Sequence, residues 1–148
     1  MRAFRFNLEK VLRLRKHNEK SWEIKLGEIV GRCNSVQREI GTLERERTQS
    51  FEKFNLQQRG IEYLQLTERY FNRLAAEKRE LINKLDELLL KKAEIQDEYL
   101  KASRKATVIE KLKERKAEQY YREQMKEELK ELDDINTQGA VRNRAQQV

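Results

Sequence analysis

The sequence predicts an all-α protein in which two long helices form an antiparallel coiled-coil hairpin of unequal arms. Three observations support this fold. Ala, Glu, Lys, Leu and Arg supply 82 of the 148 residues and proline is absent, a composition typical of long helices. Two apolar stripes follow the alternating four-and-three spacing of a coiled coil. Between them lies one polar stretch where the chain can reverse.

The first helix is expected over about residues 7–56. From Trp22 onward its apolar residues form a narrow seam rather than the wide face of a globular helix. The seam consists of Trp22, Leu26, Ile29, Cys33, Val36, Ile40 and Leu43. Beyond Leu43 the same spacing passes through Arg47 and Ser50, so the seam becomes thinner toward the turn. Gly27 and Gly31 resemble a close-packing motif, but in so charged a helix we expect them only to weaken it slightly.

The turn is expected at about residues 55–62, inside the stretch FNLQQRGIEY. Asn55, Gln57, Gln58 and Gly60 make it weak in both helix propensity and charge pairing. The start of the second helix is rich in aromatic residues, so these should lie at the turn end of the hairpin. The two chain termini should lie toward the opposite end.

The second helix is expected over about residues 60–136, followed by a frayed tail at 137–148 where hydrophobic periodicity is lost. Ten of the twelve positions in its stripe are apolar. The stripe consists of Phe71, Leu74, Lys78, Leu81, Leu85, Leu88, Lys92, Ile95, Tyr99, Ala102, Ala106 and Ile109. After Ile109 the spacing slips to Leu112, which indicates a stammer or the end of regular pairing. The whole chain, 1–148, is thus expected to be a single hairpin.

Neither catalysis nor metal binding is expected. Two paired helices offer no pocket of the size that a catalytic site requires. His17 and Cys33 are far apart and belong to no cluster with metal-ligand spacing, and no glycine-rich phosphate loop is present. We therefore expect no enzyme activity and no cofactor, with Cys33 serving as a small buried hydrophobe.

The first twenty residues lack the continuous apolar segment of an export signal. The sequence contains no run of the roughly 20 apolar residues that a helix needs to cross a bilayer. A single cysteine cannot form an internal disulfide, which favours a reducing, cytoplasmic location. A transit peptide remains an alternative because the start is basic and amphipathic, although Glu9 and Glu19 count against it.

Two basic segments stand out. Residues 1–20 and residues 101–116 each carry a net charge of +5, within a chain of formal charge +7. An antiparallel hairpin brings both toward the terminal half. Docking on a protein, a simply solvated charged face, and binding to nucleic acid or anionic lipid all remain open. The apolar residues at the start are better suited to a protein groove than to base stacking.

The opening FRFNLEKVLRLRKHNEK resembles the start of the FliJ family, whose members often begin F-x-F-x-L-x-x-V-L-x-x-R. This family is the small coiled-coil component of the bacterial flagellar type III export apparatus. The far end, EKLKERKAEQYYREQMKEELKELDDI, resembles the charged end of that family's second helix. The resemblance covers nearly the whole chain, although the interior is generic coiled coil.

The resemblance implies a stalk-like hairpin at the cytoplasmic face of the inner membrane, beneath the flagellar basal body. Its partners would be the hexameric export ATPase and the cytoplasmic domain of the large export-gate membrane protein; handling of export chaperones remains open, and nucleic acid is not expected. By position, the residues facing the ATPase would be Phe4, Leu8, Val11, Leu12, Arg13, Arg15, Lys111, Leu112 and Arg115. Those facing the gate would be Tyr70, Phe71 and Leu74. The stretch TERYFNRLAAEK departs from the family pattern around the gate set.

Two alternatives remain beside the export stalk. One is an unrelated structural coiled coil in which extended chains dimerise. The other is a basic protein that binds nucleic acid or a membrane surface, with an affinity that falls log-linearly with salt.

Overall fold

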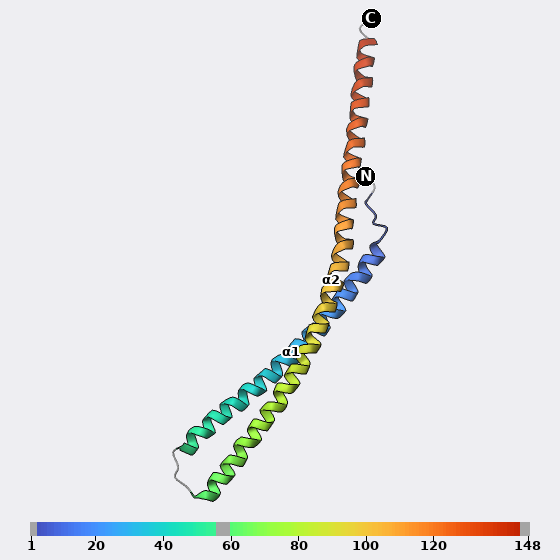
Figure 1. Ribbon diagram of the computed structural model, residues 1–148. Coiled ribbons are helices and arrows are strands. Elements are labelled where there is room, and N and C mark those ends of the chain that lie inside the picture. Colours follow the sequence, from blue (N-terminus) through green and yellow to red (C-terminus); the bar gives the residue numbers. More distant parts are fainter. Residues whose placement is uncertain (1–2, 56–59, 146–148) are drawn as a thin grey trace. The chain divides into compact units, whose positions relative to one another are not determined.

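The computed structural model describes residues 3–55 and 60–145, which form two long helices (Figure 1). Helix α1 spans Glu9–Asn55 and helix α2 spans Ile61–Ala145, with lengths of 47 and 85 residues. The predicted hairpin of unequal arms is confirmed. Each helix begins close to its predicted start. The gap between Asn55 and Ile61 falls within the predicted turn, although residues 56–59 lie outside the described residues.

The sequence explains why these helices are long. No proline interrupts the chain, and the described backbone has no residue with positive φ. Glu9 and Glu62 lie in the first turns and Lys53 lies in the last turn of α1, where each charge complements the helix dipole. The carbonyl of Gly60 accepts hydrogen bonds from the amides of Tyr63 and Leu64, at 3.1 and 3.3 Å, and so starts α2.

The end of α2 differs from the prediction. The helix was expected to end near residue 136, but it continues to Ala145. Hydrophobic periodicity is lost at Thr137, yet an exposed helix needs no apolar stripe when nothing breaks its backbone. The hydroxyl of Thr137 donates to the Asp133 carbonyl at 2.6 Å, so this residue follows the helical backbone. Residues 146–148 lie outside the described residues.

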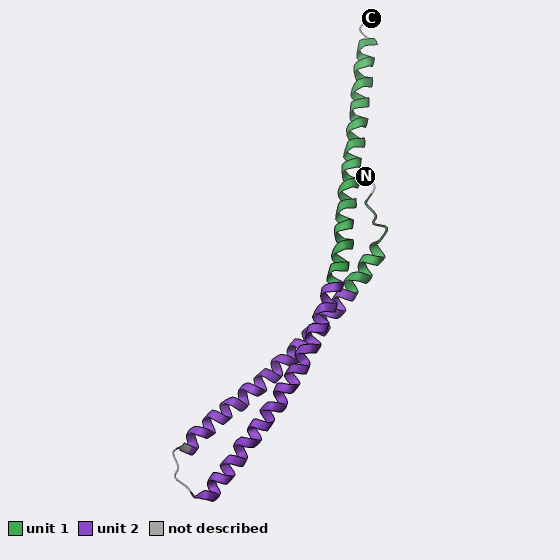
Figure 2. Cartoon of the chain, in the orientation of Figure 1, with its two compact units in different colours: residues 1–17, 103–148 green, residues 18–102 purple. Residues whose placement is uncertain are grey.

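Contacts within the chain divide into two units, and both helices run through both (Figure 2). Unit 1 contains residues 1–17 and 103–148, and unit 2 contains residues 18–102. In unit 2 the two predicted stripes face each other. The buried core there consists of Ile29, Cys33, Val36 and Leu88, surrounded by Leu26, Ile40, Leu81, Leu85 and Ile95. The seam assignments on both helices are therefore confirmed.

Large side chains hold the helices at the turn end of unit 2. The Phe71 ring lies 6.3 Å from Phe51 and 5.5 Å from Phe54, and Phe54 lies 5.4 Å from Tyr63. Near the middle of the unit the seam is closed by smaller residues such as Cys33 and Val36. Since helix separation follows the size of the side chains between the helices, α1 and α2 stand further apart toward the turn (Figure 1).

Gly27 and Gly31 do not mark a close approach of helices. A Cβ atom added at either position would meet nothing within 4 Å. They therefore act only through the backbone, at a cost of about 1 kcal/mol each relative to alanine.

Candidate docking surfaces

The N-terminal segment of unit 1 folds back onto α2. The Phe4 ring lies 5.6 Å from the Tyr120 ring and 6.5 Å from Phe6. Phe6 and Leu12 are buried, with 9% and 4% of their surface exposed, and Ala106 of α2 is 2% exposed. Much of the apolar material at the start of the chain is thus used to close its own seam.

Ion pairs fasten the same segment to α2. Lys113 Nζ lies 2.9 Å from Glu9 Oε2, and Lys16 Nζ lies 3.2 Å from Glu110 Oε1. The hydrogen bond from Lys113 lowers the pKa of the Glu9 carboxyl from its ordinary value. Lys113 and its neighbour Leu112 are both half-buried, so the pairing of the two helices continues past Ile109. Of the two outcomes predicted there, a stammer or the end of pairing, the end of pairing does not occur at Ile109.

The residues predicted to face the ATPase therefore divide into two groups. The apolar members are covered by the chain itself: Leu12 is buried, while Phe4, Leu8, Val11 and Leu112 are half-buried. Arg15 is half-buried as well. Three basic members, Arg13, Lys111 and Arg115, are exposed. The predicted residues that stay exposed at this end of unit 1 are thus basic rather than apolar.

Leu14 is an exposed apolar residue that the sequence prediction left out. It is 67% exposed, next to Arg13. It lies outside the four-and-three stripe, and this position predicts its exposure, because a large apolar residue off the seam does not face the other helix of the hairpin.

The residues predicted to face the gate lie at the turn end of unit 2 and take part in its packing. Leu74 is 3% exposed and Phe71 belongs to the aromatic cluster. The Tyr70 hydroxyl donates to Glu46 Oε1 at 2.7 Å, while Arg73 lies 5.6 Å from the Tyr70 ring centroid. Tyr70 keeps part of its surface accessible. Leu74 has almost none to offer unless the helices separate.

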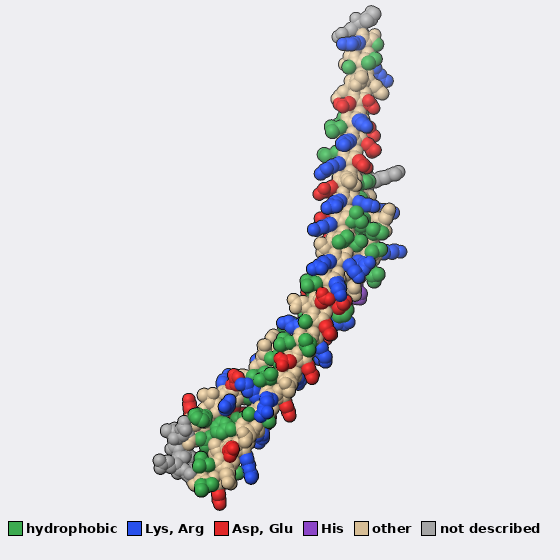
Figure 3. All heavy atoms as spheres, viewed as in Figure 1, with side chains coloured by type: hydrophobic (Ala, Val, Ile, Leu, Met, Phe, Trp, Pro, Cys, Tyr) green, Lys and Arg blue, Asp and Glu red, His purple; other side chains and the backbone are tan. Residues whose placement is uncertain are grey.

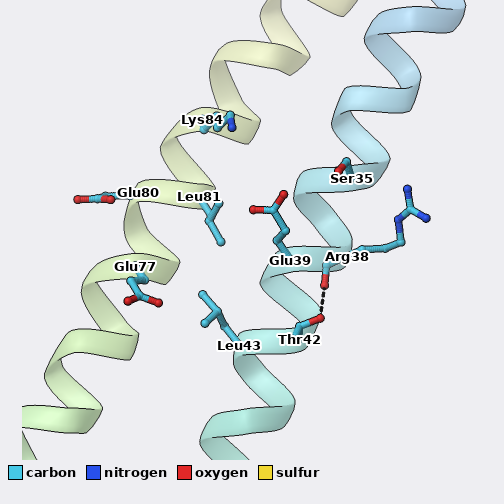
Figure 4. A pocket seen from close by; sticks show the side chains of 9 residues that line it. All are labelled: Ser35, Arg38, Glu39, Thr42, Leu43, Glu77, Glu80, Leu81 and Lys84. Atoms are coloured by element: carbon cyan, nitrogen blue, oxygen red, sulfur yellow. Dashed lines mark hydrogen bonds between the residues drawn. The ribbon is translucent and has the colours of Figure 1, made fainter.

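A groove lies beside this region, where the helices of unit 2 stand apart (Figure 4). Leu43 of α1 and Leu81 of α2 point toward each other across it, and Glu39 lies between the helices. Charged side chains, including Arg38, Glu77 and Lys84, complete its lining. The groove combines two half-buried leucines with a mixed-charge border, which suits a protein contact.

Across residues 3–55 and 60–145, no group of three or more His, Cys, Asp or Glu side chains could hold a metal ion. Within those ranges no helix combines the length and the apolarity needed to span a bilayer.

A seam closed by the chain's own side chains, with charged surfaces and a groove outside it, is the architecture of a two-helix coiled-coil hairpin. Compared with models of protein families, the chain matches the one described as flagellar FliJ protein over residues 4–145. The chain belongs to the FliJ family and is a component of the flagellar export apparatus. The comparisons with curated proteins and with solved structures found no match.

Proposed function

We propose that this chain is a non-enzymatic stalk of the export apparatus, located in the cytoplasm beneath the basal body, whose basic end docks in the ring of the export ATPase. One observation carries the proposal. Among the residues predicted to face the ATPase, the apolar ones are covered by the chain itself while Arg13, Lys111 and Arg115 are exposed. The ring contact would therefore be mainly electrostatic, with acidic groups of the ATPase facing these three side chains.

The covered apolar residues would act indirectly. Phe4, Phe6 and Leu12 hold the N-terminal segment against α2, and this fixes the basic residues of both helices on one preformed surface. A preformed surface loses less conformational entropy on binding than a loose segment does. The aromatic contact thus supports docking without itself touching the ring.

We place the gate contact in unit 2, on the accessible part of Tyr70 and in the groove between Leu43 and Leu81. Both leucines are half-buried and can still gain apolar contact from a partner. A hairpin bound to the ATPase at one end and to the gate along unit 2 would link the two. Any role with export chaperones would be additional to this link.

The test is stimulation of the purified export ATPase by the full chain. We expect Arg13→Ala/Lys111→Ala/Arg115→Ala to lose most of the stimulation, since each interfacial charge pair contributes about 1 kcal/mol or more. The matched control Arg32→Ala/Arg79→Ala/Lys91→Ala removes the same charge from exposed positions of unit 2 and should stimulate normally. Circular dichroism would check that both variants stay helical. Equal loss in both variants, or no stimulation by the intact chain, would contradict the proposal.

A further inference from the structure

Helix α2 continues beyond the part that packs against the N-terminal segment. Phe4 reaches Tyr120, and every described residue from Met125 to Ala145 is exposed. In this part of unit 1 no described residue of α1 covers the helix. Figure 3 shows apolar side chains among acidic and basic ones along it.

The apolar residues of this overhang share one face. They are Tyr121, Met125, Leu129, Leu132 and Ile135, with between 52% and 66% of each exposed. Their steps of four, four, three and three keep them within about one third of the helix circumference. We call this set the terminal stripe. Five large apolar side chains at helical spacing on an uncovered helix form a surface suited to another helix.

The terminal stripe is not the continuation of the intramolecular seam. The seam ends in unit 1 with Tyr120 and Gln124, which are half-buried and joined by a hydrogen bond of 3.0 Å. Its next positions, Glu127 and Glu131, are acidic. The terminal stripe is rotated to the side of that seam, so a partner bound there would not compete with the N-terminal segment.

The charge around the terminal stripe indicates the chemistry of the partner. Residues 123–134 hold six acidic and two basic side chains, in contrast to the basic residues 101–116. One side of the stripe carries Glu127, Glu131 and Asp134, at steps of four and three, and Glu128 lies within the stripe. The other side carries Asp133 together with Arg122 and Lys126, so the acidic residues outnumber the basic ones around the stripe. Such a surface repels nucleic acid and anionic lipid.

The acidic residues also argue against a second copy of this chain as the occupant. In a symmetric pairing about the middle of the stripe, Glu128 would face its own counterpart. Two glutamates that face each other directly across the pair would repel and destabilise it.

We propose that the terminal stripe binds an amphipathic helix of another protein, one whose apolar face is bordered by Lys or Arg. The contact lies on residues separate from Arg13, Lys111 and Arg115 and is opposite in charge, so it is independent of the ATPase docking surface.

The probes are two fluorescent synthetic helices of three heptads with the same Leu and Ile positions. One carries Lys at the flanking positions and the other carries Glu. Titrated with the full chain, the Lys peptide should bind about tenfold more tightly than the Glu peptide, since three complementary pairs replace three repulsive ones. Equal affinity for the two peptides, or no binding of the Lys peptide, would overturn the proposal.

Two variants assign the contact. Met125→Gln/Leu129→Gln/Leu132→Gln keeps helix propensity and should abolish binding of the Lys peptide, whereas Leu14→Gln, at the exposed apolar residue of α1, should not. Glu127→Lys/Glu131→Lys/Asp134→Lys should reverse the preference between peptides. Binding that survives the glutamine variant would refute the site. So would a dimer of the intact chain, seen in sedimentation equilibrium, that the same variant dissolves.

Discussion

Leu74 and Tyr70 lie one helical turn apart in α2 and differ in what they can do. Leu74 is almost fully covered, so its contribution is to the stability of the hairpin. Tyr70 is half-buried and bonded to Glu46 across the helix pair, so part of its ring can still meet a partner. Both were predicted to face the gate, and only the structure separates their roles.

The first expectation at this scale concerns stability. Leu74→Ala should lower the free energy of unfolding by about 2–4 kcal/mol, because it leaves a cavity in the seam. The control Leu89→Ala, at a residue that is 41% exposed, should cost less than about 1 kcal/mol. Urea unfolding followed by circular dichroism measures both. Similar costs for the two variants would show that Leu74 is not held in the seam.

Burial along the seams could be predicted from residue spacing, since Ile29, Cys33 and Val36 occupy positions that must face the partner helix. The fate of Phe6 could not. It precedes α1, and helical spacing does not say where a residue outside the helix folds. Its ring lies 6.5 Å from Phe4, whose ring lies 5.6 Å from Tyr120 of α2, and no local pattern encodes an arrangement of residues so far apart in sequence.

At the scale of the helices, ion pairs on the two arms follow one alignment. Glu44 pairs with Lys78 at 2.8 Å in unit 2, and Glu9 pairs with Lys113 at 2.9 Å in unit 1. Between the two pairs both helices advance by the same 35 residues (44 to 9 and 78 to 113), which is five heptads. The slip of spacing after Ile109 therefore leaves no net insertion on either arm.

These pairs predict a dependence of stability on pH. Hydrogen bonds from Lys113 and Lys78 lower the pKa of Glu9 and Glu44 from the ordinary value of 4.5. A carboxyl with a lowered folded-state pKa stabilises the fold above its unfolded pKa and loses that effect as the pH falls through the folded value. The Glu9 side chain is 37% exposed and that of Glu44 is 55% exposed, so water screens both pairs and the effect should be modest.

We expect the melting temperature to decrease as the pH is lowered below about 4.5, which is the ordinary pKa of a glutamate carboxyl. Glu9→Gln/Glu44→Gln should remove part of that fall. The control Glu68→Gln/Glu131→Gln alters two exposed carboxylates outside these pairs and should leave the pH profile as in the intact chain. Thermal melts between about pH 3 and pH 7 provide the comparison. Identical profiles for the two double variants would exclude a contribution from the interhelical pairs.

Element boundaries show the limits of pattern reading. The turn was predicted because Asn, Gln and Gly interrupt both helix propensity and the stripe. The end of α2 was placed too early because a missing stripe reports missing packing rather than missing helix. The terminal stripe lies on a different face of α2 from the main seam, so the spacing of the seam does not predict it.

At the scale of the whole chain, each unit closes its apolar seam with segments from both arms of one molecule. The extended-dimer alternative requires that seam to be filled by a second chain. We therefore expect a monomer whose melting temperature does not change with protein concentration over about a hundredfold range. Sedimentation equilibrium provides an independent measure of mass. A melting temperature that rises with concentration would favour the dimer.

Charge is also distributed at this scale. The basic segments 1–20 and 101–116 precede an acidic stretch at 123–134, and the net charge of +7 conceals this separation. Composition alone suggested one general attraction for acidic partners. The order of the charges along α2 instead suggests two surfaces with opposite preferences.

The burial of Cys33 has a practical consequence. It is the only cysteine in the chain and only 3% of it is exposed, so a thiol reagent can reach it only when α1 and α2 move apart. The rate of labelling therefore reports how often the two helices separate transiently, and no engineered cysteine is needed. A partner that stabilises the contact between the helices would lower the labelling rate of Cys33, and a partner that separates them would raise it.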